Sequence, residues 1–163
     1  MSQTFEYPNL LTGSRSGIGW TYDSGSFYKP LLNHDLHNST KNENYIQSPL
    51  FILKHGITYA FSALTANTAN CMSAEIWILY EKVGVDGWIG GVIRSVGKGP
   101  GGGWVTHTFS LPSTSPEGHY YLRFDNNGST DGKDALIWFN SPMLCIAEEP
   151  HAWAPAEGEV WPE

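Results

Sequence analysis

The chain has 163 residues and a formal net charge of −7 at pH 7, with nine lysines and arginines against sixteen aspartates and glutamates. This length fits one domain that buries a core without disulfide support. The basic residues are scattered singly, so no positive stripe exists for a phosphate backbone, which excludes nucleic acid as a partner. No run of about 18 apolar residues exists, which excludes membrane insertion. The opening MSQTFEYPN lacks the features of a signal peptide, so we expect no leader.

The composition favours an all-β chain. Eighteen glycines, ten prolines and 13% aromatic residues accompany only 15% charged residues. Turn formers and aromatic residues are typical of strands and their connections, whereas surface helices need more Glu, Lys, Arg and Leu.

In chain order, apolar or alternating segments separated by turn residues predict strands. The polar stretch NHDLHNSTKNEN (33–44) is predicted as a loop, and KGPGGG (98–103) as an irregular loop that can adjoin a ligand. The turn GVDG predicts a hairpin between the two segments that flank it. The predicted strands are 9–12, 19–23, 27–32, 48–53, 57–67, 73–83, 88–97, 104–112, 119–128 and 134–147.

These segments predict an antiparallel two-sheet β-sandwich, a jelly roll, of about eight to ten strands. We expect it to occupy residues 1–147, followed by an irregular tail over 148–163 that packs on the sandwich or on a neighbour. In the tail, Trp153 and Pro155 are expected to cover a sheet edge or the mouth of the sandwich, and Trp161 to contact a neighbouring protein.

Alternation also predicts a face for a ligand. Trp77 shares a strand face with Glu75, and Arg123 shares one with Tyr121 and Asp125. Sugar binding needs aromatic faces that stack on pyranose rings and planar polar groups that bond adjacent hydroxyls. If the faces lie on one sheet, they form a concave saccharide site. The candidate residues are Trp77, Arg94, Trp104, Tyr121, Arg123, Asp125 and Trp138, with Trp88 and Trp104 as alternative contacts on loops.

Each candidate has a simpler interpretation. Trp77 or Trp138 can fill the core, and Arg123 with Asp125 can form a plain ion pair on a solvated sheet. The strand carboxylates Glu75, Glu81 and Asp125 show no clear pairing, and no GxSxG motif occurs, so we expect no enzymatic activity.

Two polar segments are candidate metal sites. HDLH places His34 and His37 around Asp35, a set that can bind zinc or nickel but is more often merely solvated. DNNGSTDGKD (125–134) is rich in oxygen donors for calcium but lacks the register of an EF-hand, and turns rich in Asn and Asp look the same. Cys71 and Cys145 match no metal or redox spacing, so we interpret them as two half-buried thiols, and a disulfide between them depends on a geometry that the sequence does not show.

Five motifs together resemble one family: NLLTGS, ITYAFSALTAN, WVTHTFSLP, SPEGHYYLRFDNNG and IWFNSPMLCIAEEPHAWAPAEGE. Their types and order are similar to the jelly-roll, carbohydrate-binding-module-like domains of bacteriophage tail and baseplate proteins, over nearly the whole chain. The resemblance implies a virion protein, assembled in the host cytoplasm, that binds host surface polysaccharide for adsorption. Jelly-roll binding modules often hold a structural calcium ion, so the resemblance makes calcium a candidate cofactor, with no ligands assigned.

Two other functions fit the same fold. A structural virion protein, acting as a decoration or adaptor domain, would bind other virion proteins through an apolar patch or an exchanged tail. An accessory domain of a larger enzyme is the third class. Since copies on a particle multiply weak sugar affinity, we expect a homo-oligomer such as a trimer.

Overall fold

The computed structural model describes residues 5–22, 26–29, 33–38, 44–81, 93–96 and 99–159, which form eleven β-strands. The described part of the chain contains no helix with the length and apolarity that a membrane span requires.

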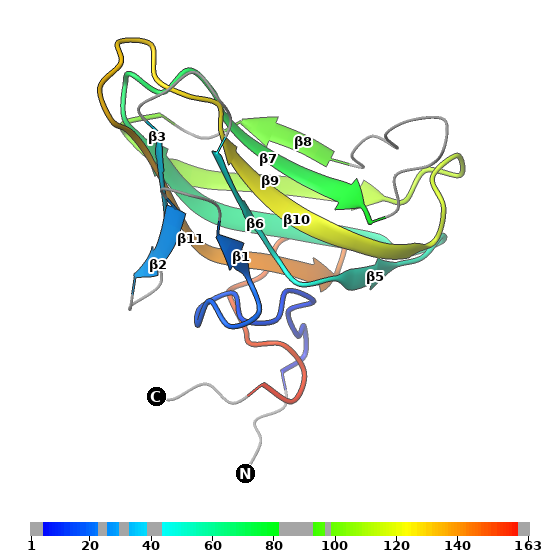
Figure 1. The fold of residues 1–163 in the computed structure, drawn as a ribbon. Coiled ribbons are helices and arrows are strands. Elements are labelled where there is room, and N and C mark those ends of the chain that lie inside the picture. Colours follow the sequence, from blue (N-terminus) through cyan, green and yellow to red (C-terminus); the bar gives the residue numbers. More distant parts are fainter. Residues whose placement is uncertain are drawn as a thin grey trace.

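The strands form two antiparallel sheets, one behind the other in Figure 1. The first, which we call the β10 sheet, has the order β1 (Thr21–Tyr22), β4 (Asn44–Gln47), β10 (Gly118–Asn126), β7 (Ala74–Tyr80), β8 (Ile93–Val96), and β5 (Phe51–Leu53) also pairs with β10. The second, the β11 sheet, has the order β2 (Ser26–Lys29), β3 (Asn33–Asn38), β11 (Ala135–Ile146), β6 (Thr58–Asn67), β9 (Gly103–Ser110). The predicted all-β, antiparallel two-sheet sandwich is confirmed.

Period-two alternation produces the core between the sheets. On β10, Tyr120, Leu122 and Phe124 are fully buried, and Phe139 on β11 is equally buried. The rings of Phe124 and Phe139 stack across the two layers with centroids 3.7 Å apart. Because successive side chains of a strand point to opposite faces, this inward set leaves the residues between them on the outer faces.

Two of the predicted segments differ from the structure. Residues 9–12 form no strand, and only Asn9 makes an isolated bridge, to Ala156. The predicted loop 33–44 instead contains β3 and the start of β4. The alternation of this segment was not recognised, because its inward-facing position 34 carries a polar histidine in place of an apolar residue. The predicted hairpin turn 84–87 lies outside the described residues, although β7 and β8 do pair antiparallel.

The buried histidine is His34, which is fully buried beside Trp20. Its Nε2 donates to the carbonyl oxygen of Ser14 at 2.7 Å, and its Nδ1 lies 3.0 Å from the hydroxyl of Tyr22. Since Nε2 carries the proton, the Tyr22 hydroxyl donates to Nδ1. Both ring nitrogens are therefore engaged in the interior.

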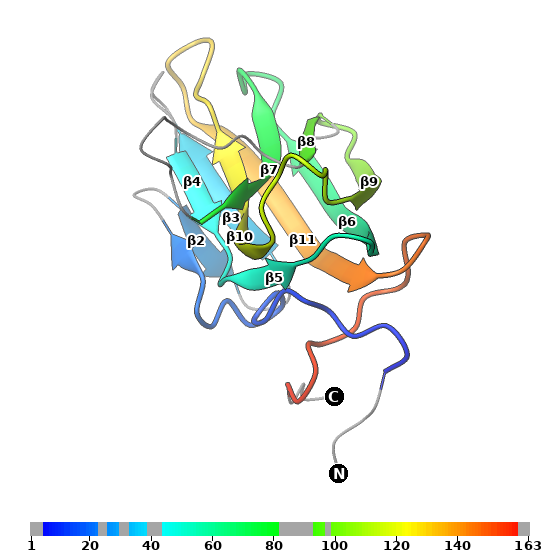
Figure 2. The same ribbon diagram turned by 90° about the vertical axis from the view of Figure 1, so that its right-hand side faces the viewer.

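The C-terminal tail lies beside the N-terminal segment at one end of the sandwich, as both ribbon views show (Figure 1, Figure 2). Trp153 and Ala154 pack on Ala60, Met143 and Cys145, which belong to β6 and β11. The indole Nε1 of Trp153 donates to the Ser14 hydroxyl, 2.9 Å away. The tail therefore covers part of the outer face of the β11 sheet. The sequence led us to expect it at a sheet edge or at the mouth of the sandwich instead. Trp161 lies outside the described residues.

Asn9 joins these terminal segments to β11. Its Oδ1 accepts hydrogen bonds from the backbone N–H of Leu11 and of Leu144, each at 3.0 Å. Its Nδ2 donates to the carbonyl oxygen of Pro142 at 2.9 Å and to the hydroxyl of Ser14 at 3.2 Å. The side chain is buried, so it satisfies four polar groups that water does not reach.

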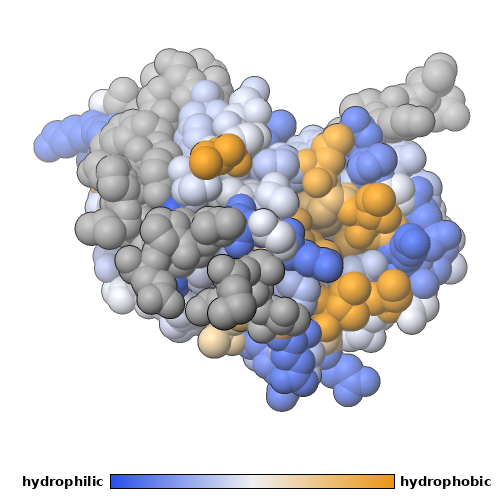
Figure 3. All heavy atoms as spheres, turned by 90° about the horizontal axis from the view of Figure 1, so that it is seen from below, coloured by the Kyte–Doolittle hydropathy of each residue, from blue (hydrophilic) through white to orange (hydrophobic). Residues whose placement is uncertain are grey.

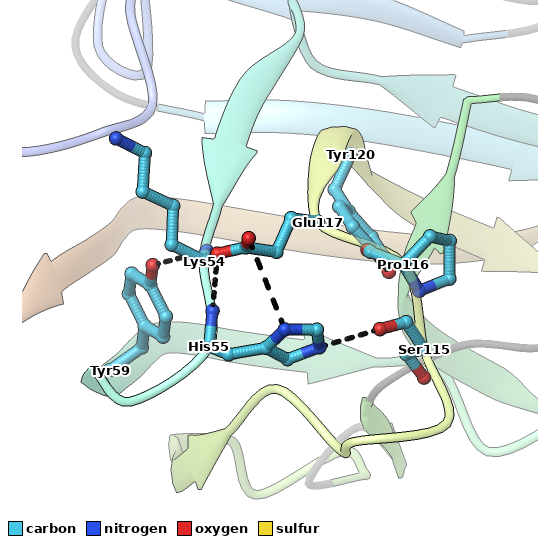
Figure 4. Close-up of polar contacts among 7 residues, drawn as sticks. All are labelled: Lys54, His55, Tyr59, Ser115, Pro116, Glu117 and Tyr120. Carbon is cyan, nitrogen blue, oxygen red and sulfur yellow. Dashed lines mark hydrogen bonds and ion pairs between the residues drawn. The ribbon is translucent and has the colours of Figure 1, made fainter.

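Polar contacts hold together the turns that precede β6 and β10 (Figure 4). The backbone N–H of His55 donates to Glu117 Oε2 at 2.8 Å, and His55 Nε2 donates to the carbonyl oxygen of Ser115 at 2.8 Å. The Tyr120 hydroxyl donates to the carbonyl oxygen of Pro116 at 2.7 Å. These groups hold the connection before β6 against the connection before β10.

Candidate functional site

The sequence-predicted site residues divide between the two sheets. Trp77, Tyr121, Arg123 and Asp125 lie on β7 and β10, whereas Trp104 and Trp138 lie on β9 and β11 of the other sheet. Arg94 is on β8, where its backbone pairs with Trp77, and its side chain is outside the described part of the structure. The expectation that Trp138 joins Trp77 and Arg123 in one patch is wrong, because the core separates the outer faces of the two sheets.

The larger group of candidates forms what we call the polar-aromatic face, on the outside of the β10 sheet. Its members are Tyr45, Gln47, Glu75, Trp77, Tyr121, Arg123 and Asp125. Cross-strand register aligns them in rows, because directly paired residues project from the same face of a sheet.

One row crosses the whole sheet. Thr21 pairs with Gln47, Gln47 with Arg123, Arg123 with Trp77, and Trp77 with Arg94. With neighbouring strands about 4.8 Å apart, the four steps from β1 to β8 span about 19 Å. A second row places Asp125 between Tyr45 and Glu75.

Arg123 and Asp125 form the polar centre of this face. Arg123 Nε donates to Asp125 Oδ1 at 2.7 Å, and the guanidinium carbon lies 4.3 Å from the ring centroid of Tyr45. The side chains are 21% and 5% exposed, so this is a largely buried pair and not the solvated surface pair of the simpler interpretation. Stacking on Tyr45 and the bond to Asp125 hold the guanidinium plane in one orientation.

Burial governs protonation at this centre. Burial raises the pKa of the Asp125 carboxyl above its ordinary value, the bond and charge of Arg123 oppose this, and the Glu75 carboxylate raises it further. Burial also raises the pKa of Tyr121, and the nearby Asp125 and Tyr45 add to the effect. The Tyr121 hydroxyl therefore stays protonated at neutral pH and can donate a hydrogen bond.

Trp77 is positioned by polar contacts on the outer face and does not belong to the core. Its Nε1 donates to Glu75 Oε2 at 3.3 Å, and Asn127 Nδ2 donates to the same oxygen at 3.0 Å. The side chain is half-buried, whereas its strand neighbours Ile76 and Ile78 are fully buried. The core interpretation is therefore wrong for Trp77.

The sequence prediction missed Tyr45 and Gln47, which extend the face onto β4. They lie between the predicted loop 33–44 and the predicted strand 48–53, in a stretch where no strand was expected. The pattern NYIQ alternates around the fully buried Ile46, and this short period-two signal identifies the strand.

Trp104 and Trp138 adjoin a separate hollow on the outer face of the β11 sheet, which we call the glycine-loop groove. Its volume is about 440 Å³. Trp138 is half-buried in its lining, and Trp104 is 53% exposed on the same face, paired with Leu64. The lining residues are Leu64, Thr65, Ala66, Gly101, Gly102, Gly103, Trp138 and Asn140.

The candidate metal segments do not assemble a donor set in the described part of the chain, where no group of three His, Cys, Asp or Glu side chains converges. HDLH is in strand β3, where both ring nitrogens of the buried His34 are already hydrogen-bonded within the protein. In the 125–134 segment, Asp131 Oδ1 accepts hydrogen bonds from Asn70 Nδ2, the Ser129 hydroxyl and the Lys133 N–H. An oxygen that already accepts three hydrogen bonds does not fit a carboxylate presented to calcium. A structural calcium ion stays a prediction.

Asp131→Asn is expected to reduce the acid sensitivity of folding. The pKa of Asp131 is lowered from 3.8 to about 2 by the hydrogen bonds from Asn70, Lys133 and Ser129. The folded state thus favours the ionised carboxylate, so this contribution is present above pH 3.8 and is lost as pH falls through about 2. The difference in unfolding midpoint between wild type and variant should be larger at about pH 5 than at about pH 2. Equal differences at both pH values would contradict this assignment.

Cys71 and Cys145 are both free, as predicted. Cys145 is buried and Cys71 is partly buried, and burial raises the pKa of each thiol. Neither is therefore activated as a nucleophile.

No model of a protein family matches the sequence, and neither does any curated protein. Among solved structures, the N-terminal cellulose-binding domain of β-1,4-glucanase C from Cellulomonas fimi is similar, with a TM-score of 0.60 and 13% identity over 88% of this chain and 98% of that domain. The tripod from the baseplate of bacteriophage Tuc2009 has a TM-score of 0.59 and 14% identity, over 96% of this chain and 61% of that one.

The enzymatically active domain of tailspike protein 4 of bacteriophage CBA120 has a TM-score of 0.59 and 11% identity, over 85% of this chain and 21% of that one. Likeness at these identities establishes the fold. The chain has the fold of a carbohydrate-binding-module-like jelly roll that also occurs in phage tail and baseplate proteins, as the sequence resemblance implied.

Proposed function

We propose that this protein is a non-catalytic, carbohydrate-binding phage virion protein that adsorbs to a host surface polysaccharide through the polar-aromatic face. The observation that carries the proposal is the row in which Gln47, Arg123 and Trp77 are paired on three adjacent strands. The fold shared with the cellulose-binding domain and with the phage baseplate tripod supports the sugar ligand and the virion location.

The face contains the two elements that sugar recognition needs. Trp77, Tyr45 and Tyr121 offer aromatic surfaces for the apolar side of pyranose rings, and Gln47 and Arg123 offer planar groups for adjacent hydroxyls. Contacts within the sheet hold Trp77 and Arg123 in place before a ligand arrives, which lowers the entropy cost of binding. The row of about 19 Å fits a chain of several sugar rings lying across the strands.

The carboxylates of this face favour binding over hydrolysis. Glu75 and Asp125 are direct cross-strand partners, so they stand side by side and not on opposite walls of a cleft. Glu75 accepts hydrogen bonds from Trp77 and Asn127, and Asp125 accepts one from Arg123. Each carboxylate therefore has a structural role in orienting the side chains that would contact a sugar.

A structural virion protein is the second candidate, and one observation favours it. Apolar surface is exposed at the end that carries both termini, which is seen from below in Figure 3. Ile52 on β5 and Ile146 at the end of β11 are 51% and 55% exposed. Such surface suits contact with other virion proteins or with further copies of the chain, and a homotrimer stays a prediction.

Affinity electrophoresis through gels that contain purified bacterial surface polysaccharides tests the proposal. We expect retarded migration with at least one neutral polysaccharide, and competition that strengthens as soluble oligosaccharides lengthen from one ring to several, because the row is extended. Unretarded migration with every polysaccharide, together with retention on other virion proteins, would replace this proposal with the structural one.

A further inference from the structure

We propose that the glycine-loop groove is a second binding site, for a single neutral sugar ring, on the sheet opposite the polar-aromatic face. This inference goes beyond the proposed function, because the two outer faces are separated by the full thickness of the sandwich. A ligand in the groove contacts none of the residues of the polar-aromatic face.

Three strands build the groove. The register pairs Trp138 on β11 with Ala66 on β6, and Asn140 with Leu64, so these four side chains share the outer face. Trp104 on β9 pairs with Leu64 from the other side. The floor is therefore aliphatic, with one indole and one amide on β11 and a second indole beyond the floor.

The glycine run forms a further part of the lining. Gly99 exchanges hydrogen bonds with Asn67, whose Oδ1 accepts from the Gly99 N–H at 2.8 Å and whose own N–H donates to the Gly99 carbonyl at 3.1 Å. Gly102 has a φ of +68°, and a Cβ there would lie 3.3 Å from the Thr65 carbonyl oxygen and 3.4 Å from the Ala66 Cβ. The positive φ and these close distances favour glycine at this position, and a side chain here would crowd the floor.

A chain of hydrogen bonds orients the amide of Asn140. Arg15 Nε and Nη2 both donate to the Ser141 hydroxyl oxygen, at 3.2 and 3.0 Å, and that hydroxyl donates to Asn140 Oδ1 at 2.7 Å. Ser141 has a φ of +51° at the irregularity between Asn140 and Met143, a conformation that is costly for a residue with a Cβ. The guanidinium of Arg15 is in turn held 3.8 Å from the ring centroid of Trp153 in the tail. These contacts fix which end of the amide carries the donor.

The chemistry of the lining selects the ligand. None of the eight lining residues is charged, which matches a neutral ring and disfavours an anion or a cation. An indole beside an aliphatic floor suits the apolar side of a pyranose, and the oriented amide suits its hydroxyls. The volume of about 440 Å³ is within the range of small-molecule sites and suits one ring better than a polymer.

The test is a titration of the ¹⁵N-labelled protein with methyl β-D-glucopyranoside, methyl β-D-galactopyranoside and N-acetyl-D-glucosamine, followed by amide and indole chemical shifts. At least one of these sugars should shift the signals of Gly101, Gly102 and the Trp138 indole. Trp138→Ala should abolish the shifts of the glycine amides. Asn140→Asp keeps an acceptor for Ser141 but removes the amide donor, and should weaken binding roughly fivefold or more, the effect of one lost hydrogen bond.

Trp77→Ala is the reference that separates the two sites. It should leave the shifts of the glycine loop unchanged, although it removes an aromatic platform from the polar-aromatic face. Glycine-loop signals that respond to none of the three sugars, or that respond equally in Trp138→Ala, would overturn the inference even if a polysaccharide binds the polar-aromatic face. If Trp138→Ala does not fold, unchanged affinity of Asn140→Asp would overturn it instead.

Discussion

Trp77→Ala is expected to lower the affinity for the host polysaccharide by at least about tenfold, because aromatic side chains that a ligand covers contribute about 2 kcal/mol or more at such sites. Trp77 lies inside the row that crosses the sheet, between Arg123 and Arg94. Its indole is oriented by the bond to Glu75, so its ring presents a fixed surface. Calorimetric titration with the polysaccharide, or with an oligosaccharide of several rings, measures the effect.

Two further variants make this result specific. Trp77→Phe keeps an aromatic ring but loses the Nε1 donor to Glu75, so an intermediate affinity is expected. Ile146→Ala removes an exposed apolar side chain from the end of the other sheet and should bind as the wild type does. Because Trp77 is only half-buried, Trp77→Ala should unfold near the wild-type temperature. A folded Trp77→Ala variant with undiminished affinity would exclude the polar-aromatic face as the site.

Asn9→Ala should lower the free energy of unfolding by about 3–5 kcal/mol, since each buried polar group left without a partner costs about 1–3 kcal/mol. The substitution leaves the N–H groups of Leu11 and Leu144 and the carbonyl of Pro142 without their bonds. For a chain of this size, a loss near 4 kcal/mol lowers the unfolding midpoint by roughly 8–16 °C. Thermal unfolding followed by circular dichroism measures it.

Asn70→Ala is the matched control for Asn9. The Asn70 side chain also makes four hydrogen bonds, to Thr68, Asp131, Lys133 and Asp134, but it is only half-buried, and the last three of these bonds are exposed to water that can replace them. We expect a loss below about 1 kcal/mol there, because a solvated group has an alternative partner. If both variants lose the same stability, burial is not what makes Asn9 important, and the N-terminal segment is not joined to β11 in the way described.

Most strands of the two sheets could be predicted from sequence because their alternation is clean. Residues 57–67, 104–112 and 119–128 correspond closely to β6, β9 and β10. The wrong strand predictions occur where a polar residue occupies an inward position, or where a segment forms an isolated backbone bridge without a regular strand. His34 in the interior disguised β3, and Asn9 forms a single bridge where NLLT looked like a strand.

The sequence by itself determined the class of fold and which side of each strand turns outward, since period two follows from the strand backbone alone. It thereby placed Tyr121, Arg123 and Asp125 on the face of their strand opposite the core, whereas it left Trp77 open between the core and the outer face. Only the tertiary structure decided which outward faces are neighbours, because the pairing of distant strands is a long-range property that no local pattern contains. Strand pairing places Tyr45 and Gln47 beside Arg123. Trp104 and Trp138 lie instead on the opposite sheet, where they adjoin the glycine-loop groove.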